Sequence, residues 1–240
     1  MKKGQKLEKR QDWFVDRHLL GSKFNRSYEL HNLKVGFSAI LNSKLSKRSA
    51  IASDLHKLEM CAVISMMALS GGRVSEVLDL KFVDITIEKD ADGTGWIVVY
   101  MPNIKQKKGA KKEIKKIPLM IDPKKDNYFL FEMIDTWYFA VKSELEKGLK
   151  ENQIEEQDIF NLKFFPSFSR SVVHSYSTKF CRLNPHGFRK IQAHYLVVDK
   201  EMPLKIVQRL LGHRHLGNLD FYINLRTTDI KESLKRAEKN

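Results

Sequence analysis

Apolar side chains recur at helical spacing in the stretch that follows Asp54. The apolar positions on this face are Leu55, Leu58, Ala62, Met66 and Leu69. Asp54 is suited to cap the amino end of such a helix, whereas the pair Gly71 and Gly72 stops it. The pattern therefore places Arg73 at a helix junction, and a second helical turn is expected from Val74.

The pattern then changes to three β-rich segments, at residues 82–88, 96–101 and 114–119. The turn sequence DADGTG separates the first two segments, and a long lysine-rich loop separates the last two. A small antiparallel sheet is the expected arrangement.

Helical spacing returns at residues 127–147, where a strongly amphipathic helix is expected to end at Gly148. From Ser167 onward the sequence favours successive short helices, with Pro185 and Pro203 near helix starts, where a missing N–H costs little. The predicted fold class is therefore mainly α with a small antiparallel β-sheet (α+β).

The amino-terminal part of the chain is basic and less regular. Residues 1–48 hold helical patches around 13–20 and 28–41 and are predicted to form an arm or a small helical appendage. Residues 49–240 are predicted to form the main domain.

Charge narrows the class of partner. The 240 residues include 43 lysines and arginines against 29 acidic residues, a net charge of +14, which favours a polyanion such as nucleic acid. A soluble basic protein without such a partner is the competing interpretation. The longest apolar run is too short to cross a bilayer, and the charged start does not resemble a secretory signal. Cys61 and Cys181 lack metal-ligand spacing, so we expect free thiols in a reducing cytoplasm and no zinc site.

Five residues have the side chains needed to cut a phosphodiester. They are Arg73, His186 and Arg189 in the tetrad HGFR, His213, and Tyr222 nine positions after His213. Direct attack on the phosphorus requires an oxygen nucleophile, cationic donors to the non-bridging oxygens and a proton for the departing oxygen. Taken singly each residue has an ordinary explanation, such as a cation at a helix end or a tyrosine in the core. Their order and spacing favour catalysis.

The segments SGGRVSEVLDL, HGFR, LLGH and FY resemble the catalytic motifs of the tyrosine recombinases, also called phage-type integrases, over residues 53–240. The resemblance implies that Arg73 and Arg189 clamp the scissile phosphate, and that His186 and His213 bind its oxygens and assist proton movement. Tyr222 is implied as the nucleophile that forms a 3′-phosphotyrosyl intermediate, without metal or cofactor. Glu76 matches an acidic position that supports the active-site arginine.

The resemblance also implies a general-acid lysine on the hairpin loop NIKQKKGAKKEIKK, which offers seven lysines. Lys105 fits best and Lys107 is the alternative. For the remaining loop lysines, nonspecific contact with phosphates is the expected role. The expected DNA-binding residues are Lys107, Lys108, Lys111, Lys112 and Lys190.

Three features depart from the family pattern. Ser70 stands where a threonine is usual, and Lys190 stands where a histidine is common, so Lys190 is expected to contact DNA instead. Most members carry a separate helical core-binding domain at the amino end, whereas only 72 residues precede Arg73. The sequence leaves open whether this domain is absent or trimmed.

The function expected from the resemblance is site-specific recombination or integration of double-stranded DNA. Members commonly act as homotetramers that exchange their carboxyl-terminal tails, and the cytoplasm, on the nucleoid, is the expected location. Two alternatives stay open: a type IB topoisomerase-like DNA relaxing enzyme, and a DNA-binding accessory protein without catalysis.

Overall fold

The computed structural model describes residues 26–44, 53–102 and 114–212. Helices dominate this part of the chain, and three strands form an antiparallel sheet in the order β1-β2-β3. The elements are α2 (Arg26–Leu41), α3 (Asp54–Ser70), α4 (Val74–Leu78), η2 (Phe82–Asp84), β1 (Ile85–Lys89), β2 (Gly95–Pro102), β3 (Ile114–Ile121), α5 (Tyr128–Lys150), α6 (Glu156–Ile159), α7 (Arg170–Cys181), α8 (Pro185–His194), the π-helical turn η3 (Tyr195–Asp199) and α9 (Leu204–Leu211). The predicted fold class is confirmed.

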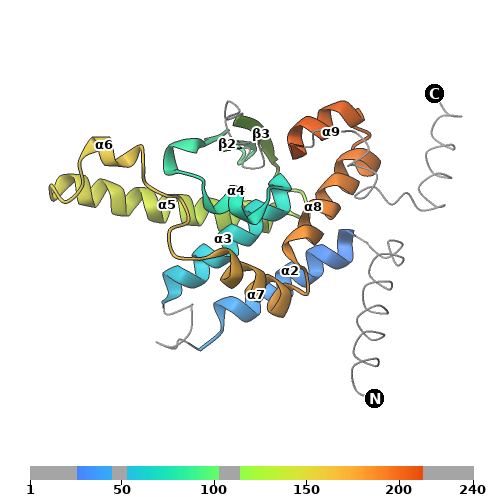
Figure 1. Cartoon of the computed structure of the whole chain (residues 1–240), viewed down its shortest axis with the longest axis horizontal. Coiled ribbons are helices and arrows are strands. Elements are labelled where there is room, and N and C mark those ends of the chain that lie inside the picture. Colours follow the sequence, from blue (N-terminus) through green and yellow to red (C-terminus); the bar gives the residue numbers. More distant parts are fainter. Residues whose placement is uncertain (1–25, 45–52, 103–113, 213–240) are drawn as a thin grey trace, which may run out of the picture.

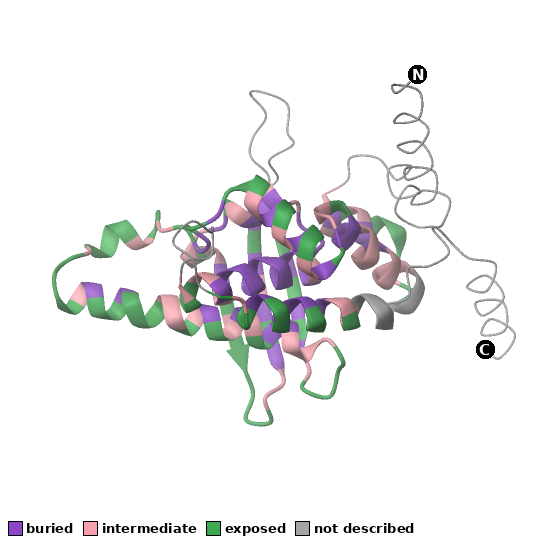
Figure 2. Ribbon diagram, turned by 90° about the horizontal axis from the view of Figure 1, so that it is seen from below, coloured by how far each residue is buried: buried purple, intermediate pink, exposed green. Residues whose placement is uncertain are grey.

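Helix α3 forms the centre of the core. Most of its residues from Met60 onward are buried, and it contacts α2, α4, α5, α7, α8 and β3. Figure 1 places the sheet on one side of α3 and the pair α2 and α7 on the other. In Figure 2 the buried residues gather around α3 and the sheet, whereas the end of α5 that extends toward α6 is largely exposed.

The start of α3 differs by one residue from the expected cap. Ser53, not Asp54, is the N-cap, and its hydroxyl accepts a hydrogen bond from the His56 N–H at 3.1 Å. Asp54 is the first helical residue, where a negative charge suits the positive end of the helix dipole. The helix ends at Gly71 as expected, with φ at 61°.

The sheet turns one apolar face toward the helices. Ile97, Val99 and Met101 of β2 are buried, and in β3 the inward positions alternate with exposed ones. The first predicted β segment, 82–88, is in fact a 3-10 turn, η2, followed by β1. Met101 pairs with Lys115 in the register between β2 and β3, so a lysine occupies an inward position of the last strand.

Helix α5 does not end at Gly148, so this expectation is wrong. The helix continues to Lys150, and the chain then turns back through Asn152, which has a φ of 53°. A Cβ at position 148 would lie 2.6 Å from Ile154 Cδ1, so the returning chain packs where a side chain would stand. Gly148 therefore leaves room for Ile154 to pack against the helix, and it does not end the helix.

Helix α2 packs against α3 and α7, and its Leu33, Phe37 and Ile40 belong to the main core. This helix lies inside the segment 1–48 that the sequence assigns to an arm or appendage. The division between that segment and residues 49–240 stays a prediction.

Candidate active site

Arg73 lies where α3 gives way to α4, and the local sequence explains its placement. The Ser70 hydroxyl donates to the Met66 carbonyl at 2.5 Å and accepts from the Gly72 N–H at 3.0 Å, which fixes the chain as it leaves α3. Gly71 adopts a left-handed conformation, and a Cβ there would lie 2.6 Å from Leu211 Cδ2. The Ser70 hydroxyl thus makes both of the side-chain hydrogen bonds that hold the backbone at this junction. Arg73 is the N-cap residue of α4.

Glu76 is fully buried and holds Arg73 at two points. Its Oε1 accepts from Arg73 Nη1 at 2.5 Å, and its Oε2 accepts from the Arg73 backbone N–H at 3.0 Å. An N3 glutamate commonly bonds the backbone N–H of the N-cap residue, so α4 gains its cap from the same carboxylate. The expected supporting role agrees with this geometry, and an ordinary surface glutamate is excluded.

Lys115 completes this ion pair from the sheet. Its Nζ donates to Glu76 Oε2 at 2.8 Å, and its side chain is only 7% exposed. Among the hairpin lysines we expected nonspecific phosphate contacts outside the two general-acid candidates, and for Lys115 that expectation is wrong. Its ammonium group points into the protein because Ile117, Leu119 and Ile121 occupy the same inward face of β3.

Arg189 is buried on α8 and is anchored to two helix ends. Its Nη1 donates to the Gly71 carbonyl at 2.9 Å, and its Nη2 donates to the carbonyl of Leu211. Both carbonyls lie at helix carboxyl ends, where the dipole is negative and a guanidinium is favoured. Arg189 thereby joins α8 to the ends of α3 and α9, which are remote in the sequence.

The four groups form one charged cluster, with three cations around a single buried carboxylate. Burial acts to raise the pKa of Glu76, but Lys115 and Arg73 outweigh it, so the pKa lies below its ordinary range. Burial lowers the pKa of Lys115, and the charges of Arg189 and Arg73 act in the same direction against Glu76. The cluster is therefore rich in positive charge, as an anion-binding site requires.

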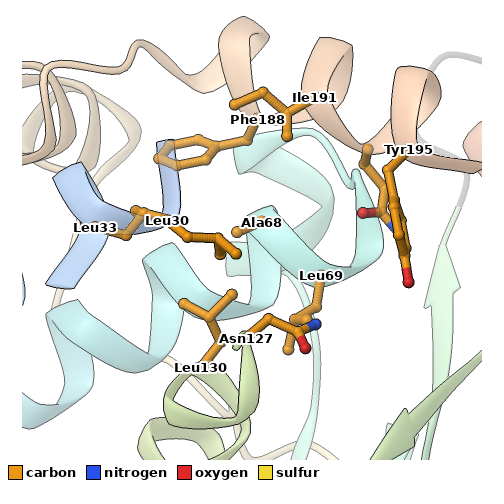
Figure 3. A pocket seen from close by; sticks show the side chains of 10 residues that line it. Leu30, Leu33, Ala68, Leu69, Asn127, Leu130, Phe188, Ile191 and Tyr195 are labelled. Carbon is orange, nitrogen blue, oxygen red and sulfur yellow. The ribbon is translucent and has the colours of Figure 1, made fainter. Parts of the chain in front are cut away.

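Helix α8 presents two different faces. His186 is exposed in its first turn, where Asn184 caps the helix by accepting from the Gly187 N–H at 2.8 Å. Arg189 lies one turn further on, and Lys190 is half-buried. In Figure 3, Phe188 and Ile191 face Leu30, Leu33 and Ala68 of α2 and α3. The cavity that these side chains line has a volume of about 30 Å³. That cavity is lined mainly by apolar side chains, so this face of α8 serves packing.

Several expected site residues lie outside the described residues. They are Lys105, Lys107, Lys108, Lys111, Lys112, His213 and Tyr222. The described chain stops at Gly212, immediately before His213. The structure thus brings together Arg73, Glu76 and Arg189 from the expected set, and adds Lys115.

Two kinds of feature are absent from the described ranges. No helix there is long and apolar enough to span a membrane. No group of three or more His, Cys, Asp or Glu side chains is placed there to hold a metal ion. Cys61 and Cys181 are buried free thiols.

Comparison with known proteins agrees with this fold. The phage integrase family model matches residues 40–228. Among curated proteins, the chain is 26% identical over 176 residues to the tyrosine recombinase XerA of Pyrococcus furiosus, covering 73% of this chain and 53% of that protein.

Solved structures of recombinases share the architecture. A crystal structure of XerA recombinase matches with a TM-score of 0.52 and 14% identity, covering 87% of this chain and 61% of that one. The XerH site-specific recombinase bound to difH substrate in a pre-cleavage complex matches with a TM-score of 0.50 and 17% identity, covering 85% and 52%. The chain spans about half the length of the curated relative it matches. At these identities the structural matches show a shared fold.

Proposed function

Because the chain belongs to the phage integrase family, we propose that it cuts and rejoins double-stranded DNA at specific sites through a tyrosine ester. The observation that carries this proposal is that Arg73 and Arg189 belong to one charged cluster, since the charges of both act on Lys115. Arg189 donates to the carbonyl of Gly71, 118 residues earlier in the chain and two residues before Arg73. The Arg73 guanidinium is bonded to Glu76 in the same cluster, so two arginines from remote segments are available to clamp one phosphate.

The proposed reaction divides the roles among the expected residues. The Tyr222 phenolic oxygen attacks the scissile phosphorus and passes its proton to a histidine, His186 or His213, as it bonds to the 3′ phosphate and the bond to the 5′ oxygen breaks. Arg73 and Arg189 stabilise the charge that develops on the non-bridging oxygens, with His186 and His213 donating hydrogen bonds. The departing 5′ oxygen takes a proton from a hairpin lysine, Lys105 or Lys107. A 5′ hydroxyl from the partner strand then attacks the ester and releases Tyr222.

Pre-organisation of the arginines supports this assignment. Free arginine side chains lose rotamer entropy when they bind a phosphate, whereas Arg73 and Arg189 are already held by Glu76 and by backbone carbonyls. Charges fixed before the substrate arrives need no reorganisation during the reaction. A homotetramer on DNA, with exchanged carboxyl-terminal tails, completes the proposal; residues 213–240 lie outside the described residues.

A covalent trap tests the nucleophile. Purified protein is incubated with a pool of nicked duplexes of randomised sequence, in which cleavage releases a short 5′-hydroxyl fragment that diffuses away. We expect an SDS-resistant protein–DNA adduct that Tyr222→Phe abolishes while DNA binding in a gel-shift assay stays intact. The matched control is Tyr100→Phe, at an exposed tyrosine on β2, which should form the adduct as the wild type does.

Each outcome of the trap decides between functions. An adduct that persists with Tyr222→Phe means that another residue is the nucleophile. DNA binding without any adduct from the wild type favours the non-catalytic accessory protein.

A further inference from the structure

Lys115 and Lys116 are adjacent in sequence but lie in different surroundings. The Lys115 side chain is 7% exposed and ends at the Glu76 carboxylate. The next residue, Lys116, is exposed, with its Nζ 5.6 Å from the ring centroid of Tyr100. The alternation of β3 thus turns one lysine into the charged cluster and the other to the surface.

Burying this ammonium group has an energetic cost that simple packing does not explain. The other inward positions of β3 are Ile117, Leu119 and Ile121, so an apolar residue would continue the pattern at 115. Taking an ammonium ion out of water is unfavourable even after the surrounding protein has relaxed. Arg73 and Arg189 add repulsion, and among the described residues Glu76 is the carboxylate that offsets it. A lysine here is better explained by the site than by stability.

The Glu76 carboxylate connects Lys115 to Arg73. Glu76 Oε2 accepts from Lys115 Nζ and from the Arg73 backbone N–H, while Oε1 accepts from Arg73 Nη1. Three donors in different directions fix the rotation of the carboxylate plane. Without Lys115, both remaining bonds would run to Arg73, and nothing described would hold the carboxylate from the side of the sheet.

Lys115 also lies at the end of α9. A Cβ built at Gly212 would lie 2.9 Å from Lys115 Cδ and 3.3 Å from its Nζ. Leu211, the preceding residue, accepts a hydrogen bond from Arg189. Lys115 therefore links β3, α4 and the end of α9 where these elements surround the two arginines.

We propose that Lys115 is a positioning residue for strand cleavage: it holds the Glu76 carboxylate, and through it the Arg73 guanidinium, in the orientation that a scissile phosphate requires. It acts through Glu76 and does not touch the reacting atoms. The proposal rests on the proposed function above for its catalytic consequence, whereas its structural part stands on the cluster alone.

Single-turnover cleavage of the nicked duplexes at saturating DNA tests the catalytic consequence. Lys115→Met should lower the cleavage rate by about 10²-fold, the effect of misplacing a reacting group by roughly 1 Å. Lys115→Arg, which keeps a cation within reach of Glu76, should restore most of the rate. The control Lys124→Met removes the same charge from an exposed position beyond the end of β3 and should leave the rate within about twofold of the wild type, since an exposed charge outside the cluster adds little. Circular dichroism at the assay temperature confirms that each variant is folded.

Nitrogen-15 NMR of the arginine side chains provides a readout that does not depend on cleavage. Rotation about the Cζ–Nη bonds of Arg73 and exchange of its guanidinium hydrogens with water should be faster in Lys115→Met than in the wild type or Lys124→Met. If the wild type forms no adduct, the proposed function fails while this measurement still decides the role of Lys115. A Lys115→Met protein with the cleavage rate and Arg73 signals of Lys124→Met would overturn the proposal.

Discussion

Replacing Glu76 with glutamine changes the charge of the buried cluster while keeping its shape. The carboxylate is fully buried and accepts from Arg73 and Lys115, with Arg189 close enough to act on the same lysine. Glu76→Gln removes the single negative charge and leaves three cations. The amide keeps one oxygen to accept a hydrogen bond, but its NH₂ group must face a cationic donor.

The expected loss of stability follows from the burial of both partners. Removing one partner of a buried ion pair costs roughly 3–5 kcal/mol, because the other charge is left uncompensated. The side chains of Glu76 and Lys115 are 0% and 7% exposed, so solvent screens this pair little. For Glu76→Gln we expect a loss of unfolding free energy at the lower end of this range, about 3 kcal/mol, because the amide oxygen can still accept from one donor. For a protein of this size that corresponds to a fall in Tm of about 6–12 °C.

The loss should depend on pH. Burial would raise the pKa of Glu76, but Lys115 and Arg73 outweigh it and depress the pKa. A carboxylate with a depressed folded pKa adds stability above its unfolded pKa of about 4.3, and that stability disappears as the pH falls through the folded value. The difference in unfolding free energy between the wild type and Glu76→Gln should therefore be largest at neutral pH and shrink below about pH 4.

Urea unfolding followed by circular dichroism measures this difference without screening the ion pairs as guanidinium chloride does. The wild type, Glu76→Gln and the control Glu132→Gln, at an exposed glutamate of α5, are compared at pH 7, 5 and 3.5. The control should lie within about 0.5 kcal/mol of the wild type. Equal stability of wild type and Glu76→Gln at pH 7 would refute the reasoning from buried charge, and a loss that does not change with pH would refute the link to ionisation.

Two other positions allow separate tests of the core. Glu59 is fully buried, accepts from the Ser167 N–H at 2.9 Å, and leaves its Oε2 without a hydrogen-bond partner among the described residues. Burial raises the pKa of Glu59, so the cost of keeping this carboxylate ionised in the folded protein grows as the pH rises through the folded pKa. Glu59→Gln should therefore raise the free energy of unfolding in urea by about 1 kcal/mol at pH 8 and by less at pH 5. An equal effect at both pH values would contradict this. Gly71→Ala should lower stability by about 1–3 kcal/mol in thermal unfolding, because φ is 61° and the added Cβ would lie 2.6 Å from Leu211 Cδ2; an unchanged Tm would show that this junction relaxes.

Local signals in the sequence predicted much of the fold. The spacing of apolar residues and the Gly71 stop predicted α3, and DADGTG predicted the turn between β1 and β2. Pro185 is the first residue of α8, and Pro203 is the N-cap residue of α9, as the chemistry of helix starts requires. Gly148 was misjudged because its role depends on Ile154, which approaches only after the chain has turned back.

The charged cluster was only partly predictable. Motif order pointed to Arg73, Glu76 and Arg189, but nothing local showed that Glu76 would be fully buried. Lys115 was missed among the seven hairpin lysines, although the alternation of side chains along the strand indicated its position. Lys115 lies on the same face of the strand as Ile117, Leu119 and Ile121, and a basic side chain on that buried face requires a partner. The partner, Glu76, lies 39 residues earlier in the chain, a separation that no local pattern spans.

The hydrogen bonds from Arg189 to the Gly71 and Leu211 carbonyls can form only after all three segments have been synthesised. Contacts across long sequence separations form late, since the intervening segment must first be made and folded back. Until α9 has emerged from the ribosome, Arg189 lacks one of its two carbonyl acceptors. A polypeptide that stops before α9 therefore holds the Arg189 guanidinium by fewer bonds, so the charged cluster is complete only after this helix has folded onto α8.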